Sequence, residues 1–190
     1  LKALEPTGCD VVFAPDANEM YGDGFATKID VGAVAVPLEG KMRPGHFTGV
    51  ATVVCKLLNI VQPTRAYFGQ KDAQQLVVIR RMAQDLNIPS EIVAAPTVRE
   101  SDGLAMSSRN VHLSPEDRRA APVLHRALTA AHDAHAKGER DARKLRAMMT
   151  EILAAEPRAT VEYISVADPL SLAELEAIGR AGALASMAVR

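Results

Sequence analysis

Arg65-Ala-Tyr-Phe-Gly-Gln-Lys-Asp-Ala-Gln-Gln75 is the stretch around which the rest of this sequence is organised. Residues 66–68 predict a short buried strand, Gly69 ends it, and Asp72 begins a helix. In an α/β fold such a turn is a common phosphate site, because free backbone N–H groups and the positive end of the helix dipole meet there. Lys71 adds a cation at the same point. The alternative is an ordinary strand–turn–helix with a solvated lysine, since short glycine motifs are not specific.

Composition narrows the class of protein. The 190 residues are 48% hydrophobic, which is enough for one core with a small appendage. The formal net charge of −1 argues against a dedicated nucleic-acid or membrane-surface binder, so we expect no nucleic-acid or membrane partner. The two distant cysteines, Cys9 and Cys55, predict a reduced, cytoplasmic protein rather than a disulfide scaffold. We expect neither a signal peptide nor a membrane-spanning segment.

The pattern of turns and apolar runs predicts an α/β region followed by a small α+β domain, hinged near Pro96 and divided as residues 1–97 and 98–190. In the first region we expect a helix tail at 1–5, a buried parallel strand at 10–15, loops at 18–24 and 40–45, helices at 46–62 and 72–86, and a strand at 91–95. In the second we expect helices at 115–136, 141–156 and 172–178, and strands at 160–167 and 183–189.

Three features of the first region carry further expectations. Strand, helix and strand across the opening stretch predict one right-handed βαβ unit of a parallel sheet. Helix 46–62 is apolar on nearly all sides, which predicts burial partly at a homodimer contact. Asp72 and Gln75 have the spacing of a capping box, so Gln75 has a purely structural alternative.

A polar segment without periodicity follows Pro96 and runs from Thr97 to Asn110. Long loops in compact proteins are often functional. The segment contains Ser107-Ser108-Arg109, in which two hydroxyls and a guanidinium could clamp an anion. The alternative is a surface turn without a ligand.

The histidines give weaker signals. His125, His132 and His135 share one helix, and solvated side chains are the better interpretation because a metal site needs further ligands. We therefore predict no protein-held metal. Pro44-Gly-His46 resembles the end of a His-x-Gly-His nucleotide signature, but Arg43 occupies the first histidine position. We expect His46 at a helix start rather than as a catalytic acid.

Six motifs occur in an order that is typical of one family. They are Arg43-Pro-Gly-His-Phe47, Val50-Ala-Thr-Val-Val54, Lys56-Leu-Leu-Asn-Ile-Val-Gln-Pro63, Phe68-Gly-Gln-Lys-Asp-Ala-Gln-Gln75, Pro96-Thr-Val-Arg-Glu100 and Asp102-Gly-Leu-Ala-Met-Ser-Ser-Arg-Asn110. This run closely resembles the pantoate–β-alanine ligases, members of the His-x-Gly-His nucleotidyltransferase superfamily. The resemblance is continuous over about residues 10–118 and weaker through the rest, where Val161-Glu-Tyr163 fits the C-terminal domain.

The resemblance implies a fold and a reaction. Residues 1–97 would be the C-terminal part of a Rossmann-like, parallel-sheet domain for ATP and pantoate, and residues 98–190 a small α+β lid. ATP, accompanied by Mg²⁺, would activate pantoate as pantoyl-adenylate with release of pyrophosphate. β-Alanine would then displace AMP to give pantothenate. The partners are thus small molecules, within a homodimer.

The resemblance also assigns residues. ATP contacts are implied for Gly69, Gln70, Lys71, Asp72, Val98, Met106, Ser107, Ser108 and Arg109. Lys71, Ser107, Ser108 and Arg109 would act on the phosphates as catalytic groups. Gln75 would hydrogen-bond pantoate, and Val50, Val54 and Phe68 would line its pocket.

One departure qualifies the resemblance. The family's His-x-Gly-His motif and a second pantoate-binding glutamine lie upstream of anything in this chain, which begins at Leu1 without a methionine. We therefore expect a fragment that lacks the N-terminal part and is inactive, or nearly so, by itself.

Two other classes stay open at this point. One is a nucleotide-binding or regulatory module without ligase activity, which the missing histidine motif favours. The other is a tRNA-ligase-like protein, because the segment from Met106 to Arg109 resembles the Lys-Met-Ser-Lys-Ser loop. Near-neutral charge argues against the second class.

Overall fold

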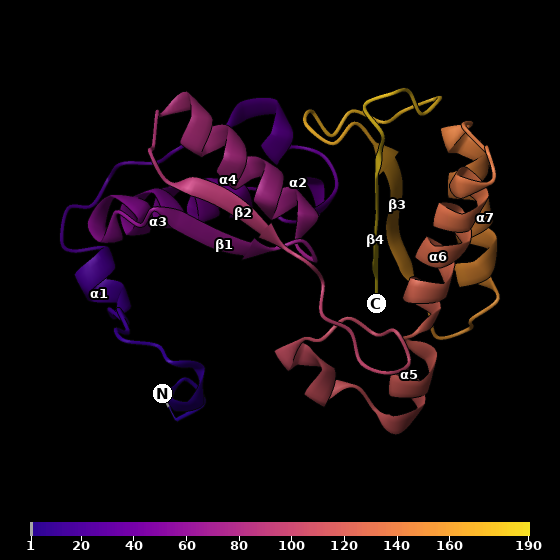
Figure 1. Ribbon diagram of the computed structural model, residues 1–190, viewed down its shortest axis with the longest axis horizontal. Helices are drawn as coiled ribbons and strands as arrows, with labels where there is room; N and C mark the ends of the chain where they lie inside the picture. The colour runs from indigo at the N-terminus through magenta and orange to yellow at the C-terminus, as the bar shows by residue number, and fades with distance from the viewer. Residues whose placement is uncertain (1) are drawn as a thin grey trace.

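The βαβ unit that the sequence predicts is present. It consists of strand β1 (Arg65–Gly69), helix α4 (Ala73–Asp85) and strand β2 (Glu91–Ala95). The computed structural model describes residues 2–190, and in it β1 and β2 pair in parallel, as predicted, from the start of each strand to its end. Helix α3 (His46–Val61) packs against α4 beside this pair (Figure 1).

The strand β1 is less buried than predicted. Ala66 and Phe68 pack against the hydrophobic cluster that α3 and α4 form, whereas Tyr67 between them is 64% exposed. Successive side chains of a strand point to opposite faces of the sheet. The prediction of a fully buried strand was wrong because, within residues 2–190, only one face of this two-stranded sheet is well covered.

The buried strand predicted at residues 10–15 is also absent. Val11 is 82% exposed, and no strand within residues 2–190 pairs with this segment. Without a ladder partner, an apolar run has no reason to adopt a strand. The helix tail expected at residues 1–5 is replaced by a short 3₁₀ turn, Glu5–Thr7; Leu1 lies outside the described residues.

Two predicted loops contain short helices. Helix α1 (Ala17–Met20) begins at Asp16, whose carboxylate accepts hydrogen bonds from two backbone N–H groups while Glu19 completes a capping box. This Asp-x-x-Glu spacing was a readable signal that the loop prediction missed. Helix α2 (Glu39–Met42) falls in the second predicted loop. The irregular segment between them contains one 3₁₀ turn, Gly32–Ala35.

The second half of the chain forms a two-layer unit. Its elements are α5 (Pro115–Ala120), α6 (Val123–Ala136), α7 (Ala142–Ala154), β3 (Val161–Ala167) and β4 (Leu184–Val189). The two strands are antiparallel, and α6 and α7 pack against them around a second hydrophobic cluster (Figure 1). The single helix expected from 115 to 136 is broken at Pro122, which has no N–H to donate to the preceding turn.

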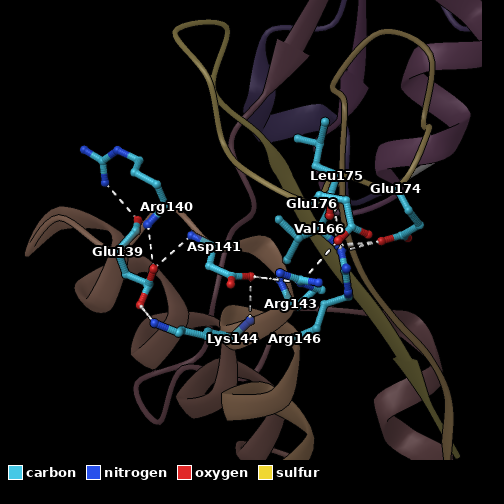
Figure 2. Close-up of polar contacts among 10 residues, drawn as sticks. All are labelled: Glu139, Arg140, Asp141, Arg143, Lys144, Arg146, Val166, Glu174, Leu175 and Glu176. Carbon is cyan, nitrogen blue, oxygen red and sulfur yellow. Dashed lines mark hydrogen bonds and ion pairs between the residues drawn. The ribbon is translucent and has the colours of Figure 1, made fainter.

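Residues 172–178 do not form the predicted helix. Leu172 has a positive φ of 59°, and the segment is bound from outside by isolated bridges and by Arg146 of α7. The Arg146 guanidinium donates to the Glu174 carboxylate at 2.8 Å and to the Leu175 carbonyl at 2.9 Å (Figure 2). These long-range contacts outweigh the apolar spacing that predicted a helix.

The same segment connects the two halves of the molecule. Leu172 is buried in the first hydrophobic cluster, together with residues of α3 and α4. Leu184 of β4 also packs against that cluster. The division into residues 1–97 and 98–190 stays a prediction, and these two side chains are where the second half contacts the first core. No helix within residues 2–190 is long and apolar enough to cross a membrane.

Candidate functional site

The turn between β1 and α4 lies where the parallel strands end. The backbone N–H of Gln70 donates to Ala95 O at 2.8 Å, so the ends of β1 and β2 are tied together at this edge. A Cβ built on Gly69 would meet no atom within 4 Å, which leaves the space beside its backbone open to a ligand. The carboxyl edge of parallel strands is the usual ligand site of open α/β sheets. In Figure 1 both arrowheads point towards the second half of the chain.

The side chains at this turn are exposed and linked only locally. Lys71 Nζ lies 3.2 Å from Asp72 Oδ1. Asp72 is the N-cap residue of α4, but its side chain accepts no capping hydrogen bond, so the predicted capping box with Gln75 is wrong. The Asp72 backbone has φ −93° and ψ 64°, outside the extended region of a usual N-cap, and its carboxylate turns to Lys71 instead. The Gln75 side chain is half-buried and makes no hydrogen bond within residues 2–190, so its role as a pantoate contact stays a prediction.

The neighbouring glutamine has a structural role that the sequence prediction missed. Gln74 is 6% exposed, and its amide nitrogen donates to Val34 O at 3.0 Å and Pro37 O at 2.8 Å. Its amide oxygen accepts from the backbone N–H of Glu39 at 3.0 Å. Gln74 therefore fastens the segment before α2 to the first turn of α4. The signal was available, because position 74 lies one helical turn before the buried Val78.

His46 is the first residue of α3, as predicted. Arg43 Nη1 lies 3.2 Å from Glu39 Oε1 and 3.4 Å from His46 Nε2. Partial burial lowers the pKa of His46, Arg43 lowers it further, and Glu39 opposes them. The lowered pKa favours the neutral ring, whose Nε2 faces the Arg43 guanidinium.

Tyr163 of β3 belongs to the second half of the chain, yet charges of the first half act on its phenol. Burial, together with the smaller effect of the negative charges of Glu39, Glu162 and Asp72, raises the pKa of Tyr163 to about 12. Asp72 and Glu39 belong to the first half of the chain, so the phenol lies within electrostatic range of the turn. The sequence prediction placed Tyr163 in the C-terminal domain without this contact.

The other predicted ATP contacts, Val98 and residues 106–109, are brought together by a hairpin. Met106 N donates to Val98 O at 2.9 Å, so these two predicted ATP contacts are cross-strand neighbours. Val98 is 65% exposed and Met106 is 57% exposed. Ser107 caps a 3₁₀ helix (Ser108–His112), and its Oγ accepts from Arg109 N at 3.2 Å. Ser108 and Arg109 are exposed.

The structure does not join the two predicted groups. No hydrogen bond or ion pair within residues 2–190 connects the turn at residues 69–72 to the segment at residues 106–109. Two surface hollows, of about 330 and 260 Å³, lie elsewhere, and Ile60 of α3 lines both. Val50 and Val54 of α3 and Phe68 of β1 all belong to the first hydrophobic cluster or its border.

The three histidines of α6 have separate surroundings. His132 Nδ1 lies 3.3 Å from Asp133 Oδ1, and His135 Nδ1 lies 3.0 Å from Glu139 O. His125 Nδ1 is buried without a hydrogen-bond partner in the described part of the chain. Within residues 2–190 no three His, Cys, Asp or Glu side chains gather as metal ligands would.

Comparison with known proteins decides the family. The family profile described as pantoate-beta-alanine ligase matches residues 1–190. The chain belongs to the pantoate-β-alanine ligase family. The prediction from the ordered motifs is thereby confirmed, and so is the prediction that the protein is a ligase.

Named relatives and solved structures agree with this assignment. The ligase is 62% identical to the pantothenate synthetase of Chloroflexus aurantiacus over 190 residues, which are 100% of this chain and 68% of that protein. A crystal structure of pantothenate synthetase from Thermus thermophilus matches with a TM-score of 0.94 at 48% identity, over 100% of this chain and 68% of that one.

A third relative carries ligands. The pantoate-beta-alanine ligase from Francisella tularensis, solved in complex with beta-gamma ATP and beta-alanine, matches with a TM-score of 0.68 at 33% identity. The match covers 86% of this chain and 59% of that one. All three relatives are ligases of this family, which supports ligation and gives no support to a nucleotide-binding module without it or to a tRNA-ligase-like protein.

Proposed function

We propose that the ligase joins pantoate to β-alanine in two steps that share one site at the end of β1. In the first step a pantoate carboxylate oxygen bonds to the α-phosphorus of ATP, the bond to the β-phosphate oxygen breaks, and pyrophosphate leaves. In the second step the β-alanine amine bonds to the acyl carbon, loses a proton, and displaces AMP. The open glycine turn with Lys71 at the carboxyl edge of the parallel strands is the observation that carries this proposal.

The first half of the chain would supply the fixed part of the site. The backbone of residues 69–72 would approach the ATP phosphates, and Lys71 would stabilise the negative charge that builds up on them. Gln75 lies one turn into α4, only about 4.5 Å farther along the helix axis than Asp72. That spacing suits a pantoate molecule whose carboxylate must reach the α-phosphate.

The second half would supply the closing part. Ser107, Ser108 and Arg109 would donate to the phosphates, and the exposed pair of Val98 and Met106 would contact the adenine. Closure would bring this segment to the turn and exclude water, which would otherwise hydrolyse the acyl-adenylate. Mg²⁺ usually keeps several waters and binds through substrate phosphates, so it would accompany the triphosphate and complete the charge balance there.

The test is pantoate-dependent exchange of pyrophosphate into ATP, measured on the full-length protein. Lys71→Ala should lower this exchange by about 10²–10³-fold, because it removes charge stabilisation of the adenylation transition state. Gln75→Ala should instead raise the pantoate KM by about 10–100-fold, through loss of a hydrogen bond to a charged group. Lys41→Ala in α2 and Gln84→Ala in α4 change exposed residues of the same types and are the controls. If adenylation survived both site variants intact, the assignment would be wrong.

We further propose a homodimer in the cytoplasm, where ATP is available. Ile60 and Val61, at the end of α3, are each 53% exposed, and a second copy would cover this apolar end. Cys9 and Cys55 are free thiols, which suits a reducing compartment. Sedimentation at high concentration should show a dimer, and a monomer alone would contradict the proposal.

A further inference from the structure

The segment that carries Ser107, Ser108 and Arg109 is preceded by a tight hairpin. Glu100 N donates to Leu104 O at 2.8 Å, and Gly103 N donates to Glu100 O at 2.9 Å. Gly103 has φ 91° and packs so closely on the His125 ring that a Cβ would collide with it. The Asp102 side chain accepts from Leu104 N at 3.1 Å. These contacts fix the backbone conformation of the hairpin. They therefore also fix where the segment that leads to Ser107 begins.

Both carboxylates of this hairpin bind one arginine of α5. Arg118 Nη1 donates to Asp102 Oδ2 at 2.5 Å, and Nη2 donates to Glu100 Oε2 at 2.8 Å. These contacts span 16 and 18 residues, and the Arg118 side chain is 31% exposed. A guanidinium can serve two acceptors at once because its N–H groups form a rigid planar fork. The hydrogen bonds from Arg118 are the largest cause of the lowered pKa of Asp102.

Asn110 closes the segment from its other end. Its amide nitrogen donates to Glu100 Oε1 at 3.3 Å and to Ala105 O at 3.1 Å. Ala105 and Asn110 lie immediately on either side of residues 106–109. The four predicted ATP contacts, residues 106–109, thus form a loop whose two ends are joined by the Asn110–Ala105 hydrogen bond. At the base of this loop, Glu100 accepts hydrogen bonds from both Asn110 and Arg118.

The charges in this region explain why a cation is needed at that base. Residues 98–110 contain two arginines, Arg99 and Arg109, and two carboxylates, Glu100 and Asp102, so the segment alone is neutral. A nucleoside triphosphate carries several negative charges. Two uncompensated carboxylates at the base of the loop would repel it, and the repulsion between exposed groups extends over about 10 Å at ordinary salt. With Arg118 added, the charged side chains of residues 98–110 and this one partner sum to +1.

We propose that Arg118 is a charge-compensating residue of the ligase: it pairs with Glu100 and Asp102 at the base of the loop and cancels their charge, so that residues 106–109 can receive a polyphosphate. Arg118 does not touch the nucleotide in this role; it acts through the two carboxylates. The inference rests on the proposed function of residues 106–109 as a phosphate-binding segment.

Kinetics of the full-length ligase test this role. Arg118→Gln should raise the KM for ATP by about tenfold at low salt, because two carboxylates become uncompensated near a polyanion. Raising the salt from about 50 mM to about 500 mM should remove most of that increase through screening. The control is Arg119→Gln on the same helix, since Arg119 pairs with Glu116 at 2.9 Å, has no other ion pair within residues 2–190 and is well exposed. It should leave the KM for ATP unchanged.

Two further variants separate charge from folding. Adding Glu100→Gln and Asp102→Asn to Arg118→Gln should bring the KM for ATP back to within about threefold of the wild type, because the repelling charges are gone. If Arg118→Gln does not fold, the double variant Glu100→Gln, Asp102→Asn with Arg118 intact tests the inference. Its amide oxygens can still accept from Arg118 while both negative charges are gone, so the KM for ATP at low salt should fall below that of the wild type. An unchanged or raised KM would overturn the role of Arg118.

The outcomes are distinguishable from failure of the proposed function. An unchanged KM in Arg118→Gln, an increase that salt does not reduce, or no recovery in the triple variant would each overturn the role of Arg118. Arg109→Ala is the separate check on the phosphate-binding segment itself. If Arg109→Ala left the use of ATP unchanged, the proposed function of the segment would fail, whatever Arg118→Gln did.

Discussion

The two candidate anion-binding segments of this ligase are built in different ways. The turn at residues 69–72 is made by four consecutive residues at the junction of β1 and α4, and its backbone geometry follows from the parallel sheet. The loop at residues 106–109 depends on partners outside itself, namely Glu100, Asn110 and Arg118. A site made by local topology can be read from local sequence, whereas one made by distant side chains cannot.

The same difference appears in how charge is arranged. At the turn the cation and its counter-charge are neighbours in sequence, with Lys71 Nζ 3.2 Å from the Asp72 carboxylate. At the loop the compensating cation, Arg118, comes from a separate helix. The turn should therefore tolerate changes elsewhere in the chain, and the loop should not.

After Lys71→Ala at the turn, the largest effect on activity is expected in the loop. Arg109→Ala should lower kcat for pantothenate formation by about 10²-fold, because it removes a guanidinium from the transferring phosphates. Its thermal unfolding midpoint should stay that of the wild type, since the Arg109 side chain is exposed. The matched control is Arg119→Ala, which should keep full activity. Full activity of Arg109→Ala would show that the loop does not act on the phosphates.

A smaller effect is expected beneath the turn. Gln74→Ala should lower the free energy of unfolding by about 2 kcal/mol, because it leaves the buried Val34 carbonyl and the partly buried Pro37 carbonyl without their donor. Urea unfolding measures this change. Gln75→Ala should stay within about 0.5 kcal/mol of the wild type. Equal destabilisation by both changes would show that the two glutamines do not divide into a structural and a ligand-binding residue.

The smallest effect is a dependence on pH. The hydrogen bond from Arg118 lowers the pKa of Asp102, so this carboxylate stabilises the folded state above its unfolded pKa of about 3.9. That contribution is lost as the pH falls through the lower, folded pKa. Arg118→Gln should therefore shift the urea midpoint downward at pH 7 and have little effect near the acid end of the titration. A shift of the same size at both pH values would contradict the assignment.

Much of the fold could be predicted from the sequence because its signals are local. As predicted, β1 ends at Gly69, α5 begins at Pro115, and Asp141 begins α7 as its N-cap. The errors fall where tertiary contacts decide. Val11 has no strand partner within residues 2–190. Leu172 is buried in the first hydrophobic cluster, and Arg146 hydrogen-bonds the segment that carries it.

The candidate site divides along the same line. The turn with Lys71 was readable because strand, glycine and helix start follow one another in the sequence. Gln74, Tyr163 and Arg118 were missed as parts of its surroundings because their partners lie far away in sequence. Residue types alone do not tell which of two adjacent glutamines is buried. The helical period does, once α4 is placed against the core.

A crystal structure of the full-length protein with pantoate and a non-hydrolysable ATP analogue tests the central claim most directly. We expect phosphate oxygens within hydrogen-bond distance of the backbone at residues 69–72, of Lys71 Nζ and of the Arg109 guanidinium, with pantoate at Gln75. Phosphates bound away from both segments, for example in the hollows beside Ile60, would contradict it.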